Sequence, residues 1–273
     1  MTGTSLSPHD LIGLARAGWR HGATHCVACD GYHQVWGSLR AAGLNAGLAS
    51  DEQGLAPQIA AALSPGAHVL VAGAADPALL DLVVRTASGM PLSILVADLC
   101  RTPLAVIDEL EPYAETDVLT EQLDLTRLDH VARWDLILSH LMIAHVPAGD
   151  RVEVLKRLRR ALAPGGRLIL VARTVGEAAR DEAADDEAAW VDRTLARLAS
   201  RGVPTPGAPG EFDALLRVYA AHRTDRLWDL ATPEAIAGLL TAGGFEVVEF
   251  ARLARADREP GADGKARYVF VAR

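Results

Sequence analysis

The sequence is poor in cysteine and aromatic residues and has no long apolar run. It has three cysteines in 273 residues, and phenylalanine, tryptophan and tyrosine together make up 5%. Three cysteines cannot build the disulfide framework of a small secreted domain. The apolar stretches at 67–75, 93–99, 135–144 and 167–172 are too short to span a bilayer, and residues 1–10 lack a secretory pattern. We therefore expect a cytoplasmic protein.

Positive charge is also in short supply. The chain has 27 lysines and arginines against 35 aspartates and glutamates, which gives a net charge of −8 at pH 7. An acidic surface repels phosphate backbones and anionic membranes, so we expect neither a nucleic acid nor a membrane as partner. Half of the residues are hydrophobic, which is enough for a large domain with a full core.

Short apolar segments alternate with amphipathic patterns through most of the chain. The spacing predicts strands at 67–72, 93–98, 117–123, 134–139, 167–173, 245–250 and 266–272, and helices at 77–88, 103–112, 149–163 and 232–242. Continuous apolar strands that alternate with helices are typical of a parallel sheet covered on both faces. The last two strands are joined without a helix, so they run antiparallel. The predicted fold class is α/β, with a doubly wound, seven-stranded, mostly parallel sheet whose last strand is antiparallel.

Two helical segments lie outside this alternation. Helical patterns at 8–18, 31–43 and 55–63 predict an N-terminal helical cap over residues 1–63, ahead of a main domain at 64–273. Residues 175–227 are predicted as a helical insertion in that domain. The acidic run 181–187 within it is interpreted as a solvated helix face.

The most informative stretch is residues 69–77, Val-Leu-Val-Ala-Gly-Ala-Ala-Asp-Pro. A buried strand runs into a single glycine, then into small residues and a helix, which is how an open α/β sheet holds a nucleotide-type ligand. The candidate ligand contacts in this turn are Ala72, Gly73, Ala74, Ala75 and Asp76.

Further motifs follow in order along the chain. Asp98 ends the second predicted strand, Asp124 follows the third, and residues 158–170 read Leu-Arg-Arg-Ala-Leu-Ala-Pro-Gly-Gly-Arg-Leu-Ile-Leu. With the order of elements, these motifs resemble the class I S-adenosylmethionine (SAM) dependent methyltransferases, and most of all those that act on small molecules in bacterial metabolism. The resemblance covers roughly residues 60–273 and implies a Rossmann-like methyltransferase fold that binds SAM.

The first motif departs from the family pattern at three positions. Val71 stands where the family has an acidic residue, and Ala75 and Pro77 stand where it has glycines. A small residue at 75 still lets a ligand approach the backbone, and proline can open the first turn of a helix.

The resemblance also implies roles for residues at the other strand ends. Asp98, with Leu99 beside it, would accept hydrogen bonds from the ribose hydroxyls. Asp124, with Leu125 beside it, would contact the adenine amino group, and Ser139 would line the site at the end of the fourth strand. Asp98 could instead cap the following helix, and Asp124 could form a turn.

The candidate catalytic residues are His140, Tyr32 and His33. His140 ends the fourth predicted strand and could serve as a general base, or it could be a satisfied polar residue. Tyr32 and Trp36 lie at i and i+4 of one predicted helix, where an aromatic face would stabilise a sulfonium; core packing is the alternative. Trp36 and His145 are assigned to a substrate pocket or lid.

Cys26 and Cys29 have the spacing of half a zinc site, and His21, His25 and His33 lie nearby. Because the second cysteine pair of a closed structural site is absent, we predict no metal.

The leading hypothesis is a SAM-dependent methyltransferase that moves a methyl group to an oxygen, nitrogen or carbon atom of a small molecule by in-line displacement. The first alternative is an enzyme of the azetidine-2-carboxylate synthase type, which cyclises SAM and releases methylthioadenosine. The second is a catalytically silent binding protein with this fold. The oligomeric state is left open, with a homodimer as one alternative.

Overall fold

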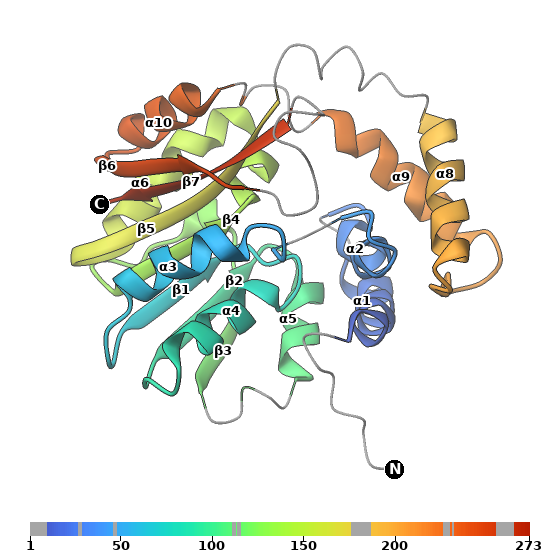
Figure 1. Ribbon diagram of the computed structural model, residues 1–273, viewed down its shortest axis with the longest axis horizontal. Coiled ribbons are helices and arrows are strands. Elements are labelled where there is room, and N and C mark those ends of the chain that lie inside the picture. Colours follow the sequence, from blue (N-terminus) through green and yellow to red (C-terminus); the bar gives the residue numbers. More distant parts are fainter. Residues whose placement is uncertain are drawn as a thin grey trace.

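A seven-stranded sheet forms the centre of the computed structural model (Figure 1). The structure describes residues 10–26, 29–45, 48–110, 113, 116–175, 187–225, 230, 232–254 and 265–273. The strands are β1 His68–Ala72, β2 Ser93–Asp98, β3 Asp117–Gln122, β4 Trp134–His140, β5 Leu162–Val175, β6 Val247–Arg252 and β7 Lys265–Ala272. Their order is β3-β2-β1-β4-β5-β7-β6. Strands β1 to β5 are parallel, and β7 runs antiparallel to β5 and β6. The predicted fold class is confirmed.

Helices cover both faces of the sheet. The helices of this domain are α3 Glu52–Ala62, α4 Ala78–Ala87, α5 Arg101–Asp108, α6 Arg151–Ala161 and α10 Pro233–Ala242, with short 3-10 turns η2 Leu125–Arg127, η3 Met142–His145 and η4 Ala148–Asp150. Helices α3, α4 and α5 share one apolar core with the sheet, and α6 and α10 share another. We call the sheet and these helices the sheet domain.

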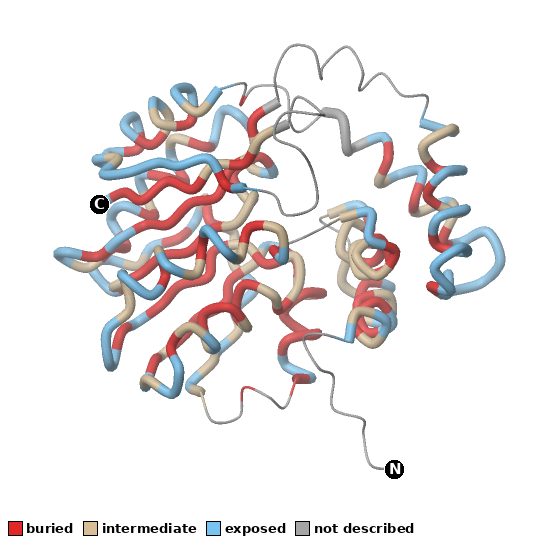
Figure 2. The backbone as a smooth tube through the Cα atoms, viewed as in Figure 1, coloured by how far each residue is buried: buried red, intermediate tan, exposed pale blue. Residues whose placement is uncertain are grey.

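The central strands contribute apolar side chains to both cores. Val69 and Val71 of β1 belong to the core under α3 and α4, whereas Leu70 and Ala72 belong to the core under α6. Successive side chains of a strand point to opposite faces, so a strand buried on both sides needs an apolar residue at every position. Figure 2 shows the central strands buried along most of their length.

Four further helices pack together beside the sheet domain (Figure 1). They are α1 Leu11–His25, α2 Tyr32–Ala41, α8 Glu187–Ser200 and α9 Glu211–Asp225. Their shared core includes Val35 and Leu39 of α2, Val191 of α8 and Leu216 of α9. We call these four helices the cap. Two segments far apart in the sequence thus form one unit.

The predicted boundary of the N-terminal cap at residue 63 is corrected by the position of α3. Leu55 and Ile59 are 1% and 0% exposed in the core beneath the sheet, because they lie one turn apart on the same face of α3. Helix α3 therefore belongs to the sheet domain. Residues 181–186 of the predicted acidic face lie outside the described residues, and Glu187 begins α8 as an exposed residue. Within the described part of the chain, no helix has the length and apolarity needed to cross a membrane.

Candidate cofactor and acceptor site

The turn after β1 has the backbone geometry of a close-approach site. Gly73 has φ +83°, and a Cβ atom at this position would lie 2.5 Å from Cγ of Met142. Its N–H donates to the carbonyl of Ala97 at 2.8 Å, which ties the turn to the end of β2. A left-handed residue without a side chain is the ordinary requirement of such a turn.

Asp98 lies at the end of β2 and links the turn after β1 to the start of α5 through hydrogen bonds. Its Oδ2 accepts from the N–H of Ala74 at 2.9 Å, and its Oδ1 accepts from the N–H of Cys100 at 2.7 Å. Burial raises the pKa of Asp98, because desolvation opposes the charged form. Each carboxylate oxygen can accept a second hydrogen bond. Leu99 beside it is 51% exposed, which leaves an apolar side chain at the carboxyl end of the sheet.

Asp124 caps a turn. Its Oδ1 accepts from the N–H of Thr126 at 2.9 Å and from the Thr126 hydroxyl at 2.7 Å, and the Thr126 hydroxyl bond lowers the pKa of Asp124. Leu125 is buried in the core that α6 covers. The structure therefore shows Asp124 stabilising a turn, which was the alternative to ligand binding. A contact of Asp124 with adenine stays a prediction.

Ser139 and His140 end β4 on opposite faces of the sheet. Ser139 is 2% exposed, and its hydroxyl has no hydrogen-bond partner among the described residues. His140 points to Asp51, with 2.8 Å between Nε2 and Oδ2. Asp51 also accepts from Arg267 at 2.6 Å. The structure thus places His140 in a buried polar network, the alternative to the predicted general base.

The network around Asp51 was missed by sequence reasoning. Asp51 is fully buried, and burial by itself opposes its charge. The hydrogen bond with His140 and the positive charge of Arg267 outweigh this effect and lower the pKa of Asp51. Residues Ser50 and Asp51 read only as a helix start in the sequence, and nothing local connects them to a residue 216 positions away.

An aromatic cluster closes over this edge of the sheet. The ring of Tyr32 stacks on Trp36 at 5.3 Å between centroids and on Tyr219 of α9 at 5.6 Å, and it meets His145 edge-on at 5.2 Å. Trp190 of α8 stacks on Tyr219. Burial raises the pKa of Tyr32 well above its ordinary value. Of these residues, Tyr32, Trp36 and His145 were predicted; Tyr219 and Trp190 carried no local signal.

Asp76 anchors the cap to the turn after β1. Its Oδ2 accepts from Nε1 of Trp36 at 2.9 Å and from the guanidinium of Arg40 at 2.5 Å, while its Oδ1 accepts from the N–H of Ala78. A small pocket lined in part by Trp36, Arg40 and Ala75 lies beside it. Asp76 was predicted as a ligand contact, but both of its carboxylate oxygens are hydrogen-bonded to residues of α2 and α4.

His33 lies between Tyr32 and the cysteines, with contacts to both. Its ring meets Tyr32 edge-on at 4.9 Å, and its Nδ1 is 3.4 Å from Sγ of Cys29. The structure therefore places His33 in contact with Tyr32 and in a cluster with three thiols.

Comparison with known proteins finds similar folds among solved structures. No protein-family model matches the sequence, and a search of curated proteins finds no match. Among solved structures, a SAM-dependent methyltransferase from Leishmania major is similar over 97% of this chain and 86% of its own, with 13% identity and a TM-score of 0.55. The fold is that of the class I SAM-dependent methyltransferases.

Two further structures have the same architecture. The 1,6-didemethyltoxoflavin-N1-methyltransferase of Burkholderia thailandensis, solved with bound 1,6-didemethyltoxoflavin and S-adenosylhomocysteine, covers 100% of this chain and 92% of its own, with 19% identity and a TM-score of 0.53. The cyclase SpnF covers 81% of this chain and 80% of its own, with 13% identity and a TM-score of 0.51. At these identities the likeness concerns the fold.

Proposed function

We propose that this chain is a SAM-dependent methyltransferase that transfers a methyl group to an oxygen, nitrogen or carbon atom of a small molecule. The proposal rests on one observation: Gly73, Asp98 and Ser139 lie together at the carboxyl end of the sheet, and the aromatic cluster of Tyr32 and Trp36 lies beside them. The fold supports it, because small-molecule methyltransferases such as the toxoflavin-precursor enzyme share that fold.

The residues at this edge fit SAM. The left-handed turn at Gly73 brings bare backbone to the edge, and Asp98 keeps acceptor capacity on both oxygens for two ribose hydroxyls. Leu99 offers an exposed apolar surface to a base. The buried hydroxyl of Ser139 lacks a partner among the described residues, and a bound ligand would satisfy it.

SAM, when bound, supplies a methyl group activated by a sulfonium. The part of the chain is to hold donor and acceptor in line and to exclude water, and such positioning can lower a barrier by about 7–11 kcal/mol. The faces of Tyr32 and Trp36 attract positive charge. Burial raises the pKa of Tyr32, which argues against a role of its hydroxyl as a base at neutral pH.

SAM binding is tested by calorimetric titration of the intact protein with SAM and with S-adenosylhomocysteine. We expect binding of both, and a loss of about 10- to 100-fold in affinity for Asp98→Asn, because a hydrogen bond to a charged group contributes about 1.5–3 kcal/mol. The matched control is Asp108→Asn, which changes a carboxylate on the exposed surface of α5. Absence of binding by the intact protein would refute the proposal.

The altered first turn supports one alternative use of the same cofactor, because Ala75 and Pro77 replace glycines and Asp76 is bound to the cap. In that alternative the enzyme cyclises SAM. Incubation with SAM alone distinguishes the two reactions. Methylthioadenosine would favour cyclisation, whereas S-adenosylhomocysteine that forms only when an acceptor is added supports methyl transfer. Binding without turnover across an acceptor panel would favour a silent binding protein.

A further inference from the structure

All three cysteines of the chain meet at one place. Cys26 is the C-cap of α1, Cys29 lies in the connection to α2, and Cys100 is the N-cap of α5, two residues after the end of β2. His33, on the first turn of α2, completes the group. One ligand atom from each of the four side chains lies within 4.8 Å of all the others.

Three of the six separations between the ligand atoms are close to the edges of a metal tetrahedron, and all six are within 4.8 Å. Sγ of Cys100 is 3.8 Å from Sγ of Cys26 and 3.6 Å from Sγ of Cys29, and Nδ1 of His33 is 3.4 Å from Sγ of Cys29. Zinc bonds of about 2.3 Å to sulfur and about 2.0–2.1 Å to nitrogen place tetrahedral ligand atoms about 3.5–3.8 Å apart. A disulfide would need about 2.05 Å between sulfurs, and the three cysteines are free.

We propose that Cys26, Cys29, His33 and Cys100 bind a zinc ion as a closed four-coordinate site. The prediction of no metal rested on the absence of a second cysteine pair. The structure supplies the two other ligands from elsewhere, since Cys100 lies 71 residues beyond Cys29 in the sequence and His33 follows Cys29 by one helical turn.

The surroundings suit a metal thiolate site. Cys100 is 2% exposed, so its sulfur is shielded from solvent, as the ligands of a closed metal site usually are. The Thr102 hydroxyl, also buried, lies 3.1 Å from Sγ of Cys26. Such neighbours orient the ligands of a metal site.

The position of the site indicates what the metal does. Two ligands lie in the α1–α2 connection, one lies on α2 and one lies two residues after Asp98, whose Oδ1 accepts from the N–H of Cys100. Four protein ligands leave no open position, which is the pattern of a structural site. Zinc would therefore fasten the cap to the sheet domain beside Asp98.

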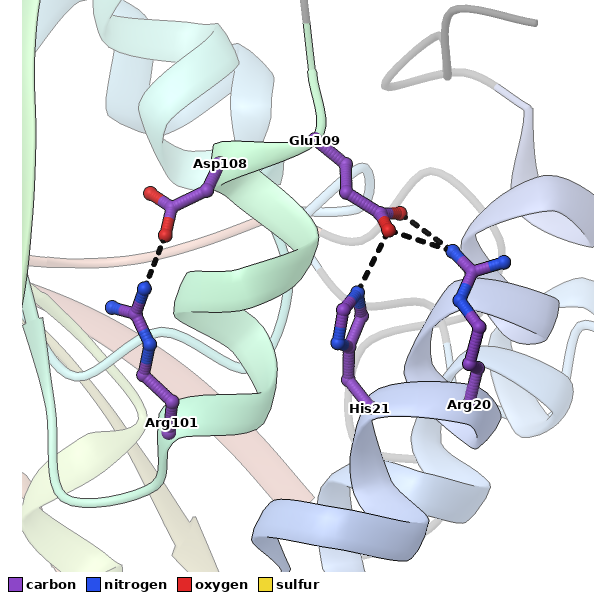
Figure 3. A network of polar contacts seen from close by, with 5 residues as sticks. All are labelled: Arg20, His21, Arg101, Asp108 and Glu109. Carbon is purple, nitrogen blue, oxygen red and sulfur yellow. Dashed lines mark hydrogen bonds and ion pairs between the residues drawn. The ribbon is translucent and has the colours of Figure 1, made fainter. Parts of the chain in front are cut away.

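Helices α1 and α5 also meet through a small apolar cluster of Leu14, Ala17 and Val106 and through an exposed polar contact. The guanidinium of Arg20 and the ring of His21 both contact Glu109 (Figure 3). The side chains of Arg20 and Glu109 are 63% and 34% exposed, and an ion pair this exposed contributes at most about 1 kcal/mol. The four-residue cluster is thus a stronger candidate than this ion pair for fixing the cap at this end, beside the apolar contact of Leu14, Ala17 and Val106.

The test is the metal content of the intact, tag-free protein purified under reducing conditions. We expect close to one zinc per chain, retained through dialysis, and its loss in Cys29→Ser, Cys100→Ser and His33→Gln. The matched control is His25→Gln, which removes a histidine adjacent to Cys26 that lies outside the cluster. Retention of zinc by His33→Gln together with its loss from His25→Gln would overturn the proposed ligand set.

A second readout does not depend on the variants being folded. The wild-type protein is stripped with a chelator and titrated with Co²⁺, for which we expect thiolate charge-transfer bands and the visible bands of a tetrahedral centre. Zinc added to the stripped, reduced protein is expected to raise its melting temperature. No bound zinc, no cobalt spectrum and no thermal shift would contradict the proposal, as would a disulfide found in the protein under reducing conditions. Neither readout involves SAM, so the outcome is independent of the proposed function.

Discussion

The sheet domain and the cap are held together by different means. The sheet domain has two large apolar cores, one on each face of the sheet. The cap unites helices from two distant segments around one smaller core. It meets the sheet domain through specific contacts, among them Asp76 with Arg40 and the cluster around Cys100. Stability therefore resides mainly in the sheet domain, and the geometry of the site depends on how the cap docks.

The largest effect is expected from the buried ion pair in the sheet domain. Asp51→Asn leaves Arg267 and His140 without their charged partner, and breaking one side of a buried pair costs about 3–5 kcal/mol. Urea unfolding measures the loss. Asp117→Asn, which changes an exposed carboxylate at the start of β3, is the control; equal losses in both variants would contradict the role of the network.

The same substitution has a defined pH dependence. The pKa of Asp51 is lowered in the folded state, so its stabilising effect is present above the unfolded value of about 3.9 and is lost as the pH falls through the folded pKa. We expect the wild-type unfolding free energy to decline below about pH 4 more steeply than that of Asp51→Asn.

Matched truncations in the two cores compare the regions directly. Leu70 in β1 and Leu216 in α9 are both 0% exposed, and Leu→Ala at such a position costs about 2–5 kcal/mol. We expect Leu70→Ala to lower global stability by this amount. Leu216→Ala should instead increase hydrogen exchange in the four cap helices and leave the sheet protected. Uniform loss of protection in both variants would show that the two regions unfold as one unit.

The contact between cap and turn should matter for binding more than for stability. Asp76→Asn removes the charge that Arg40 contacts, and a hydrogen bond to a charged group contributes about 1.5–3 kcal/mol. We expect weaker SAM binding by calorimetry with little change in global unfolding. Asp108→Asn, whose partner Arg101 lies on the same helix of the sheet domain (Figure 3), should change neither quantity.

The smallest effect is expected at the exposed pair of α1 and α5. Arg20→Ala should change the unfolding free energy by less than about 1 kcal/mol, because the pair is exposed and screened by salt. Thermal melts at low and high salt measure this difference. A loss as large as that of Leu70→Ala would show that α1 docks mainly through this pair.

The sheet domain was predictable because its signals are local. The prediction of a strand at 93–98 matches β2, and the alternating apolar and amphipathic segments placed all seven strands near their positions along the chain. The assembly of the cap was not predictable, since nothing local marks Tyr219 as a partner of Tyr32 or Trp190 as a partner of Tyr219. Cys26 and Cys29 gave half of a metal pattern, and Cys100 gave none, because its proximity arises from the end of a different strand. Local periodicity specifies elements, whereas contacts between distant segments depend on how those elements pack.

The most direct test of the proposed site is hydrogen–deuterium exchange of the intact protein with and without saturating SAM. We expect protection at the turn after β1, at Asp98 to Cys100 and along α2, with β3 and β6 unchanged as internal controls. Exchange that is the same with and without SAM at these segments would contradict the assignment of the site.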